Sequence, residues 1–351
     1  MMRTKGRGAA FNTPNRFEPL HREPLDIDLG EDEEKRVKTR YYVDSSRSIL
    51  ARNDSPDLPF TFSLNPYRGC EHGCIYCYAR PSHEYLGFSA GVDFESKIMV
   101  KPDAALLLGE ALGRPGWEPQ MVALSGNTDC YQPVERVLHL TRKCLDVFLE
   151  FRNPVGIITK NTLVLRDMDI LKEMARYNIV EVAISITSLN PELIRIMEPR
   201  TPTPANRLQA IAELARNDIP VGVNVSPIIP GLTDEEIPSI LREAAAHGAS
   251  TAAFTVVRLP GAVDPLFREW LGREFPDRAT KILNRIAASH GGTTNDAKFG
   301  RRMKGEGRQA ESLHALFSVN ARRYGLSRRW QELSTTHFRR PSPLQGDLFP
   351  R

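Results

Sequence analysis

Three cysteines fall within eight residues of this chain, and their spacing constrains its fold and chemistry more than any other feature. Cys70, Cys74 and Cys77 form a C-x3-C-x2-C pattern. Thiolates are the usual ligands of iron–sulfur clusters, and three of them supply three corners of a four-iron cluster. The fourth iron is then left without a protein ligand. The pattern therefore predicts a 4Fe–4S cluster with one open coordination position, where a substrate or cofactor can bind.

The main alternative for the same cysteines is a zinc site completed by His72 or His83. Zinc ligands usually come as two separated pairs, and the sequence contains no second Cys or His pair of that kind. The remaining cysteines, Cys130 and Cys144, stand alone. The spacing therefore favours the iron–sulfur cluster.

Composition limits where such a protein works. The chain has 351 residues, of which 41% are hydrophobic, enough for one large core with appendages. No apolar run is as long as a membrane span, and the first residues lack the apolar stretch of a secretory signal. Five cysteines with three crowded together do not suit a secreted disulfide framework. We therefore expect a cytoplasmic protein without a membrane partner.

Segments typical of strands alternate with segments typical of helices. The expected strands are 60–64, 121–125, 155–159, 180–186, 221–225 and 251–257. The expected helices are 135–151, 163–177, 191–197, 204–216, 234–247, 278–289 and 310–324. This alternation predicts a parallel sheet built from βα units, either a barrel or an open doubly wound sheet.

Polar residues at the strand ends favour the barrel. Small or polar groups follow five of the expected strands, at 125–128, 159–161, 185–187, 224–226 and 257–258. In a barrel of parallel strands, the active site is built from residues at the carboxyl ends of several strands. We therefore predict an α/β chain with three parts: an irregular N-terminal extension (1–57), disordered or draped on the core, a barrel (58–290), and a basic C-terminal extension (291–351).

The cysteine stretch resembles that of the radical S-adenosylmethionine (radical SAM) enzymes. Cys70, Cys74 and Cys77 match the family motif, and Tyr76 matches the aromatic residue that often precedes its third cysteine. The resemblance covers about residues 58–290 and implies a partial (β/α)6 barrel. It also implies a 4Fe–4S cluster, and S-adenosylmethionine bound to the open iron through its amino and carboxylate groups. Reductive cleavage to methionine and a 5′-deoxyadenosyl radical would draw on an electron donor such as a flavodoxin or ferredoxin.

The resemblance also suggests which residues meet the cofactor. The glycine-rich turn 125–128 lies where this family binds the cofactor's amino group, although Asn127 equally fits a simple turn. Lys160 ends an apolar strand and is placed to pair with the cofactor carboxylate. Arg258 is left open between cofactor and substrate. The implied cofactor-binding residues are Tyr76, Ser125, Gly126, Asn127, Lys160, Ser185 and Ser226.

A second stretch narrows the resemblance to one branch of the family. Residues 126–135 are similar to the T-D-x-Y-Q-P-x-E segment of the spore photoproduct lyase branch, also called DNA repair photolyase-like proteins, and 65–70 and 158–161 resemble it too. Such a lyase takes hydrogen from a thymine dimer and returns it from a cysteine. Cys130 is the candidate donor, and its alternative role is a small buried residue. No cysteine lies within 121–128, where a donor could sit beside the cofactor, which argues against dimer reversal itself.

Two features of the C-terminal part indicate nucleic acid. Between Lys298 and Arg340 there are eleven Lys and Arg residues against three Glu, a pattern that suits phosphate binding or, equally, a solvated tail. Aromatic residues among them can stack on bases. The end of the chain, Gln345 to Phe349, resembles the peptide with which bacterial repair proteins bind the sliding clamp. The basic and aromatic residues are Arg301, Arg302, Lys304, Arg322, Arg323, Arg328, Arg329, Tyr324 and Trp330.

Three functions remain compatible with the sequence. The first is a radical SAM enzyme that acts on DNA or RNA, in repair or modification. The second applies the same chemistry to a peptide or small metabolite. The third is a metal-stabilised nucleic-acid-binding protein without catalysis.

Overall fold

The main sheet of the protein has seven strands in the order β10-β9-β8-β7-β6-β3-β2. The computed structural model describes residues 6–17, 37–330 and 332–341. Every neighbouring pair from β3 to β10 is parallel, and β2 is antiparallel to β3 at one edge. The strands are β2 (Leu50–Arg52), β3 (Phe62–Leu64), β6 (Val122–Leu124), β7 (Val155–Thr159), β8 (Val180–Ser185), β9 (Val221–Ile228) and β10 (Thr251–Val256).

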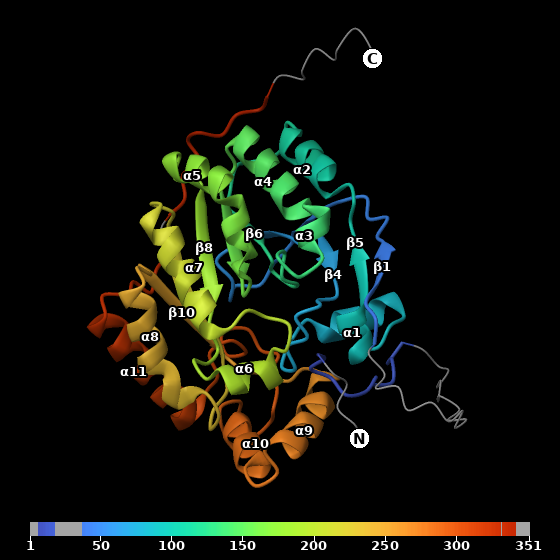
Figure 1. The fold of residues 1–351 in the computed structure, drawn as a ribbon, viewed down its shortest axis with the longest axis vertical. Helices are drawn as coiled ribbons and strands as arrows, with labels where there is room; N and C mark the ends of the chain where they lie inside the picture. The colour runs from blue at the N-terminus through green and yellow to red at the C-terminus, as the bar shows by residue number, and fades with distance from the viewer. Residues whose placement is uncertain (1–5, 18–36, 331, 342–351) are drawn as a thin grey trace.

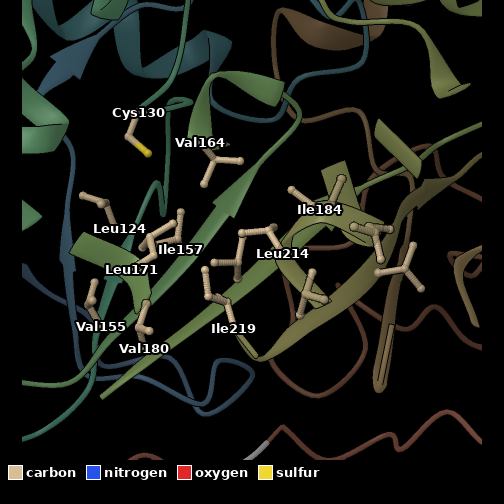
Figure 2. Close-up of a cluster of buried hydrophobic side chains, with 14 of the residues drawn as sticks. Leu124, Cys130, Val155, Ile157, Val164, Leu171, Val180, Ile184, Leu214 and Ile219 are labelled. Atoms are coloured by element: carbon tan, nitrogen blue, oxygen red, sulfur yellow. The ribbon is translucent and has the colours of Figure 1, made fainter. Parts of the chain in front are cut away.

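Helices cover one face of this sheet. Alternate residues of each strand point to that face, and in β8 these are Val180, Val182 and Ile184, which share a buried apolar cluster with helix residues (Figure 2). The residues between them, including Glu181 and Ser185, point to the opposite, inner face. The covering helices are α2 (Ala104–Gly113), α4 (Leu140–Phe151), α5 (Met168–Arg176), α7 (Pro204–Arg216), α8 (Ile237–Ala246) and α11 (Gly307–Arg323), seen around the sheet in Figure 1.

The predicted fold class is confirmed. Six parallel strands follow one another in chain order, each within a few residues of its expected place. Strands β10 and β2 lie at opposite edges of the described sheet, so the barrel is partial. The prediction of one continuous helix at 135–151 is wrong, because the segment forms two helices, α3 (Glu135–Leu138) and α4. They part at His139, whose φ of 54° is left-handed and cannot continue a right-handed helix.

Residues of the expected N-terminal extension belong to the main sheet and to a second, three-stranded sheet with the order β1-β5-β4. Strand β1 (Arg40–Val43) pairs in parallel with β5 (Lys97–Val100), which also pairs with β4 (Tyr67–Arg68). Strand β2 pairs with β3 of the main sheet. Strands β1 and β2 were not predicted, because segments of four and three residues are too short to show a period-two pattern.

The described C-terminal residues cross the amino ends of the strands. Ser327 forms a bridge with Thr251 at the start of β10, and the Ser334 N–H donates to the Asn178 carbonyl just before β8 (2.8 Å). Arg339 then donates to the Phe151 carbonyl before β7 (2.9 Å). Figure 1 shows this segment passing α5 at the top, far from helices α9 (Val263–Glu274) and α10 (Ala279–Ala288) at the bottom. The segment therefore closes the end of the sheet that lies away from the strands' carboxyl ends.

The expected domain boundaries remain a prediction, and the clamp-binding peptide 345–349 lies outside the described residues. Among the described helices, none has the length and apolar character that crossing a membrane requires.

A carboxylate on the inner face makes the stability of the fold depend on pH. Burial raises the pKa of Glu181 to about 7, whereas an unfolded chain ionises it near 4.5. Stability from this group is complete below pH 4.5 and is lost as pH rises through 7, because the folded state holds the proton longer. The loss amounts to roughly 3 kcal/mol. We predict that Glu181→Gln is more stable than the wild type at pH 8 but not at pH 4.5, in urea unfolding.

The exposed Glu235 supplies the matched control, since Glu235→Gln removes the same charge without burial. Equal pH dependence in wild type and Glu181→Gln would contradict the prediction.

Candidate functional site

The cysteine loop lies at the carboxyl ends of the parallel strands, between β4 and the 3-10 helix η1 (Arg80–Leu86). Cys70 and Cys74 are buried and Cys77 is half-buried, and all three thiols are free. Gly69 and Gly73 turn the loop with φ values of 78° and 66°, which residues with a side chain rarely adopt. The three cysteines that the sequence singles out are thus held together in one buried turn.

A buried ion pair supports the loop from beneath. Arg80 and Glu95 of α1 (Val92–Ser96) are fully buried and lie 2.5 Å apart. The Arg80 guanidinium also donates to the carbonyl oxygens of Gly73 (3.3 Å) and Cys74 (2.9 Å). Removing one partner of such a buried pair costs about 3–5 kcal/mol, because it leaves an uncompensated charge. The pair is therefore a main determinant of the loop's conformation.

The N-terminal strap, residues 7–13, packs directly on the cysteine loop. The Glu95 carboxylate accepts hydrogen bonds from the backbone N–H groups of Gly8 (2.9 Å) and Ala9 (2.8 Å). A Cβ atom on Gly8 would lie 1.9 Å from the Gly73 carbonyl oxygen, so only glycine fits there. The sequence predicted only that this region is disordered or draped on the core, and its lack of periodicity gave no signal for the contact with the cysteine loop.

The second motif, 126–135, holds the loop from the side. The Gln132 side chain accepts from the Glu71 N–H (3.0 Å) and donates to the Gly69 carbonyl (3.2 Å). The Tyr67 hydroxyl donates to the buried Glu135 carboxylate. The motif predicted only a branch of a family, whereas in the structure its polar residues bond the backbone that carries the cysteines.

Asp129 links the second motif to the centre of the loop. One of its carboxylate oxygens lies 3.4 Å from His72 Nδ1 and accepts from the Lys160 N–H (2.8 Å). Burial works against ionisation here, but His72 outweighs it and holds the pKa of Asp129 at about 2. The other ring nitrogen of His72 lies 3.1 Å from the Asn161 amide. His72 is therefore fixed between two partners.

His83, the other histidine of the zinc alternative, is packed between aromatic rings. Its ring centroid lies 5.3 Å from that of Phe88 and 5.6 Å from that of Phe94. Within residues 6–17, 37–330 and 332–341, no group of three His, Cys, Asp or Glu side chains is arranged to hold a single metal ion. His72 is held between Asp129 and Asn161, whereas the two ring nitrogens of the buried His83 have no hydrogen-bond partner among the described residues.

Lys160 reaches the cysteine loop from the end of β7. Its ammonium nitrogen lies 5.9 Å from the centroid of the Tyr76 ring. Burial alone would lower the pKa of Lys160, but Glu198 and Cys74 outweigh it and raise the pKa. No carboxylate of the described residues lies within ion-pair distance of this ammonium group. A cation in this position suits a negatively charged ligand beside the cysteines.

Tyr76 is held by a buried network that sequence reasoning missed. Its hydroxyl donates to Glu198 and lies 3.2 Å from the Thr187 hydroxyl. Glu198 forms a buried ion pair with Arg207 (2.5 Å). Burial opposes ionisation of Glu198, but Arg207 and Lys160 prevail and hold its pKa at about 2. Charged residues in a helical stretch resemble a solvated surface, so the sequence carried no signal for this network.

Three of the predicted residues lie in the turn after β6. Ser125 has a left-handed φ of 79°, and its hydroxyl accepts from the Cys130 N–H (2.7 Å). The Gly126 carbonyl accepts from the hydroxyl of Tyr78, next to Cys77 in the chain (2.5 Å). Asn127 is exposed, and its N–H donates to the Asn65 side chain (2.9 Å). Gly126 thus bonds the residue that follows Cys77, whereas Ser125 bonds within its own turn and Asn127 is exposed.

Ser185 and Ser226 lie on the inner face of neighbouring strands. Ser185 pairs in register with Asn224, and the Ser226 hydroxyl donates to the Asn224 side chain (2.6 Å). Both serines are buried. They line the same inner face as Lys160, and for Ser185 the period-two pattern predicted this orientation.

Cys130 is not brought to the cysteine loop. Its side chain is fully buried in the apolar cluster between sheet and helices, which also contains Leu124 and Val164 (Figure 2). Cys144 of α4 belongs to the same cluster. This placement on the helix side of the sheet fits the alternative role of a small buried residue and does not fit a hydrogen donor to the inner face.

Comparison with known proteins places this geometry in a family. The sequence profile of the Radical SAM superfamily matches residues 64–244, about half of the chain. The chain belongs to the Radical SAM superfamily. Members use a 4Fe–4S cluster and S-adenosylmethionine, so the predicted cofactors are confirmed at the level of the family, and three free thiols with a nearby lysine fit them.

Individual proteins extend the comparison. An uncharacterized protein of Mycobacterium tuberculosis, Rv2578c, is 38% identical over 226 residues, 64% of this chain and 66% of that protein, just under two thirds of its length. A radical SAM Nalpha-GlyT isomerase of Pseudomonas phage M6 is 24% identical over 69% of this chain and 49% of its own. The structure of a spore photoproduct lyase complexed with a dinucleoside spore photoproduct superimposes with a TM-score of 0.57 at 17% identity, covering 82% of this chain and 80% of that one.

The role of Gln132 can be tested by truncation. Gln132→Ala leaves the Glu71 N–H and the Gly69 carbonyl buried without their partner, which costs about 1–3 kcal/mol for each group. We expect a lower melting temperature and less iron per chain after anaerobic reconstitution. The partly exposed Gln120 bonds only a neighbouring carbonyl, so Gln120→Ala is the control. Equal iron content in the two variants would contradict a supporting role.

The strap makes a separate prediction. Gly8→Ala places a methyl group against the Gly73 carbonyl and should lift residues 7–13 from the loop. We expect faster modification of the cysteines by a thiol reagent in the metal-free protein, and a lower melting temperature. Gly116→Ala, at a position with open space around it, should leave both unchanged. Identical labelling rates for the two variants would show that the strap does not cover the thiols.

Proposed function

We propose that this protein is a radical SAM enzyme that acts on nucleic acid, in repair or modification. The observation that carries the radical chemistry is the buried turn with three free thiols, facing an unpaired Lys160 ammonium at the strand ends. When bound, the cluster and S-adenosylmethionine supply a 5′-deoxyadenosyl radical by one-electron cleavage of the sulfonium.

The chain's own residues would bind and orient these groups. Cys70, Cys74 and Cys77 lose their protons to become ligands, so loading releases protons. Lys160 pairs with the cofactor carboxylate, and the Ser185 hydroxyl is a donor on the same inner face. The buried setting keeps solvent away from the reacting groups, which limits side reactions.

The nucleic-acid part of the proposal is supported by the comparisons. The solved structure with the similar fold holds a dinucleoside, and the phage relative is named a Nalpha-GlyT isomerase. The basic C-terminal residues lie at two ends of the sheet. Arg302 forms an ion pair with Asp57 (2.7 Å). Arg328 and Arg329 follow Ser327, whose bridge with Thr251 places them near the amino end of β10. Of these three arginines, Arg302 is the one near the carboxyl ends of the strands.

Each of the two alternative functions predicts a different experimental result. A radical enzyme acting on a peptide or small metabolite would form 5′-deoxyadenosine without any affinity for DNA. A non-catalytic metal-stabilised binding protein would form none. An electron donor such as a flavodoxin, a sliding clamp bound by 345–349 and a cytoplasmic location remain parts of the proposal.

The proposal predicts a cysteine-dependent product. Anaerobically reconstituted protein, reduced with dithionite and given S-adenosylmethionine, should form 5′-deoxyadenosine, measured by liquid chromatography. Cys70→Ala should reduce it to the level of a protein-free sample, because one cluster ligand is lost. Cys144→Ala removes a thiol from the apolar cluster instead and should retain the product.

Substrate is then identified by deuterium transfer. Deuterated thymine-dimer DNA, undamaged DNA and RNA are supplied in turn, and deuterium is sought in 5′-deoxyadenosine. Product in wild type and in Cys70→Ala alike would refute the radical chemistry. Product without deuterium transfer from any DNA or RNA would refute the substrate class.

A further inference from the structure

Arg258 is a cation without a charge partner at the carboxyl end of β10. It lies two residues past the strand, where the Val257 N–H donates to the Ile228 carbonyl (2.9 Å) and fixes the backbone. Its guanidinium is half-buried and stacks over the Tyr78 ring at 5.5 Å. Among the residues that the structure describes, no carboxylate forms an ion pair with Arg258 and no acceptor takes a hydrogen bond from it. Removing part of a charged group from water costs free energy unless a partner compensates it.

The position of Arg258 is beside the radical-generating turn. Tyr78 follows Cys77 directly, and its hydroxyl donates to the Gly126 carbonyl after β6 (2.5 Å). The ring of Tyr78 thus extends from the cysteine loop to the turn after β6 and carries Arg258 on one face. Since 47% of Tyr78 is exposed, this group also presents an aromatic surface to solvent.

The guanidinium of Arg302 lies close enough to Arg258 for the two positive charges to repel each other. Arg302 donates to the Asp57 carboxylate (2.7 Å), which also accepts from the Gly300 N–H (2.5 Å). Burial and the positive charge of Arg302 together lower the pKa of Arg258. Among the described residues, Asp57 is thus committed to Arg302, and the positive charge of Arg258 is left without an ion-pair partner next to the cysteine loop.

We propose that Arg258 binds a phosphate group of the nucleic-acid substrate, with the Tyr78 ring beside it as a stacking surface for a base. This deepens the proposed function and rests on it. The planar guanidinium fork matches a phosphate with two parallel hydrogen bonds. An exposed aromatic ring next to a cation is the combination with which proteins hold single-stranded nucleic acid, and it favours a nucleotide over a peptide carboxylate.

The test is the binding of a fluorescein-labelled dT12 oligonucleotide to the reconstituted protein, followed by anisotropy without reductant. Arg258→Gln should weaken binding about tenfold and lower the slope of log K against log salt by about one. Arg258→Lys keeps the charge without the fork, so it should keep the slope and lose part of the affinity. The control is Arg242→Gln on α8, an exposed arginine paired with Glu243, which should bind as the wild type does.

Each outcome decides the proposal. An Arg258→Gln variant that melts like the wild type and binds like Arg242→Gln, with the same slope, would overturn it. Equal competition by a twelve-residue glutamate peptide would also overturn it, by assigning the site to carboxylates. Failure of the wild type to form 5′-deoxyadenosine would remove the proposed radical chemistry, while a loss of binding in Arg258→Gln would still establish the phosphate contact.

Discussion

The ion pair of Arg80 and Glu95 is the interaction on which the rest of the site depends. A turn that carries three cysteines in eight residues cannot pair its own backbone as a helix or strand does, yet buried carbonyl groups must find donors. Arg80 supplies these donors, and Glu95 neutralises Arg80 while it binds the strap. Two side chains thus help to bury the three thiols without leaving the Gly73 and Cys74 carbonyl groups unsatisfied.

The parts of the fold that sequence reasoning predicted are those with a local physical cause. Buried parallel strands are rich in apolar and β-branched residues, so β7 to β10 stand out from their surroundings. Alternation of side chains then placed Lys160 and Ser185 on one face. Strand β1 and the strap show no local sequence pattern of this kind. Gly8, for instance, is required only because the Gly73 carbonyl, far along the chain, lies where a side chain would be.

The same distinction explains the site. The cysteines were recognisable because ligand spacing is a local property of sequence. Glu95 and Glu198 were not, since a single buried carboxylate is indistinguishable from a surface one until its arginine is in place. The role of Cys130 as a hydrogen donor was predicted without knowing its orientation, because a residue in a turn has no strand alternation to show which side of the sheet it faces. Its thiol lies on the helix side.

The two described ends of the chain are tied to opposite ends of one sheet, which has a consequence for how the molecule assembles. The contact of Gly8 with Glu95 closes a span of 87 residues, and that of Arg340 with Arg114 closes one of 226. Closing the longer span costs only about 1 kcal/mol more entropy than closing the shorter one, because the cost grows with the logarithm of length. The strap docks on the cysteine loop and α1, whereas the C-terminal segment docks on the amino ends of the strands. The thiols therefore gain this covering layer only once the loop and Glu95 are in position.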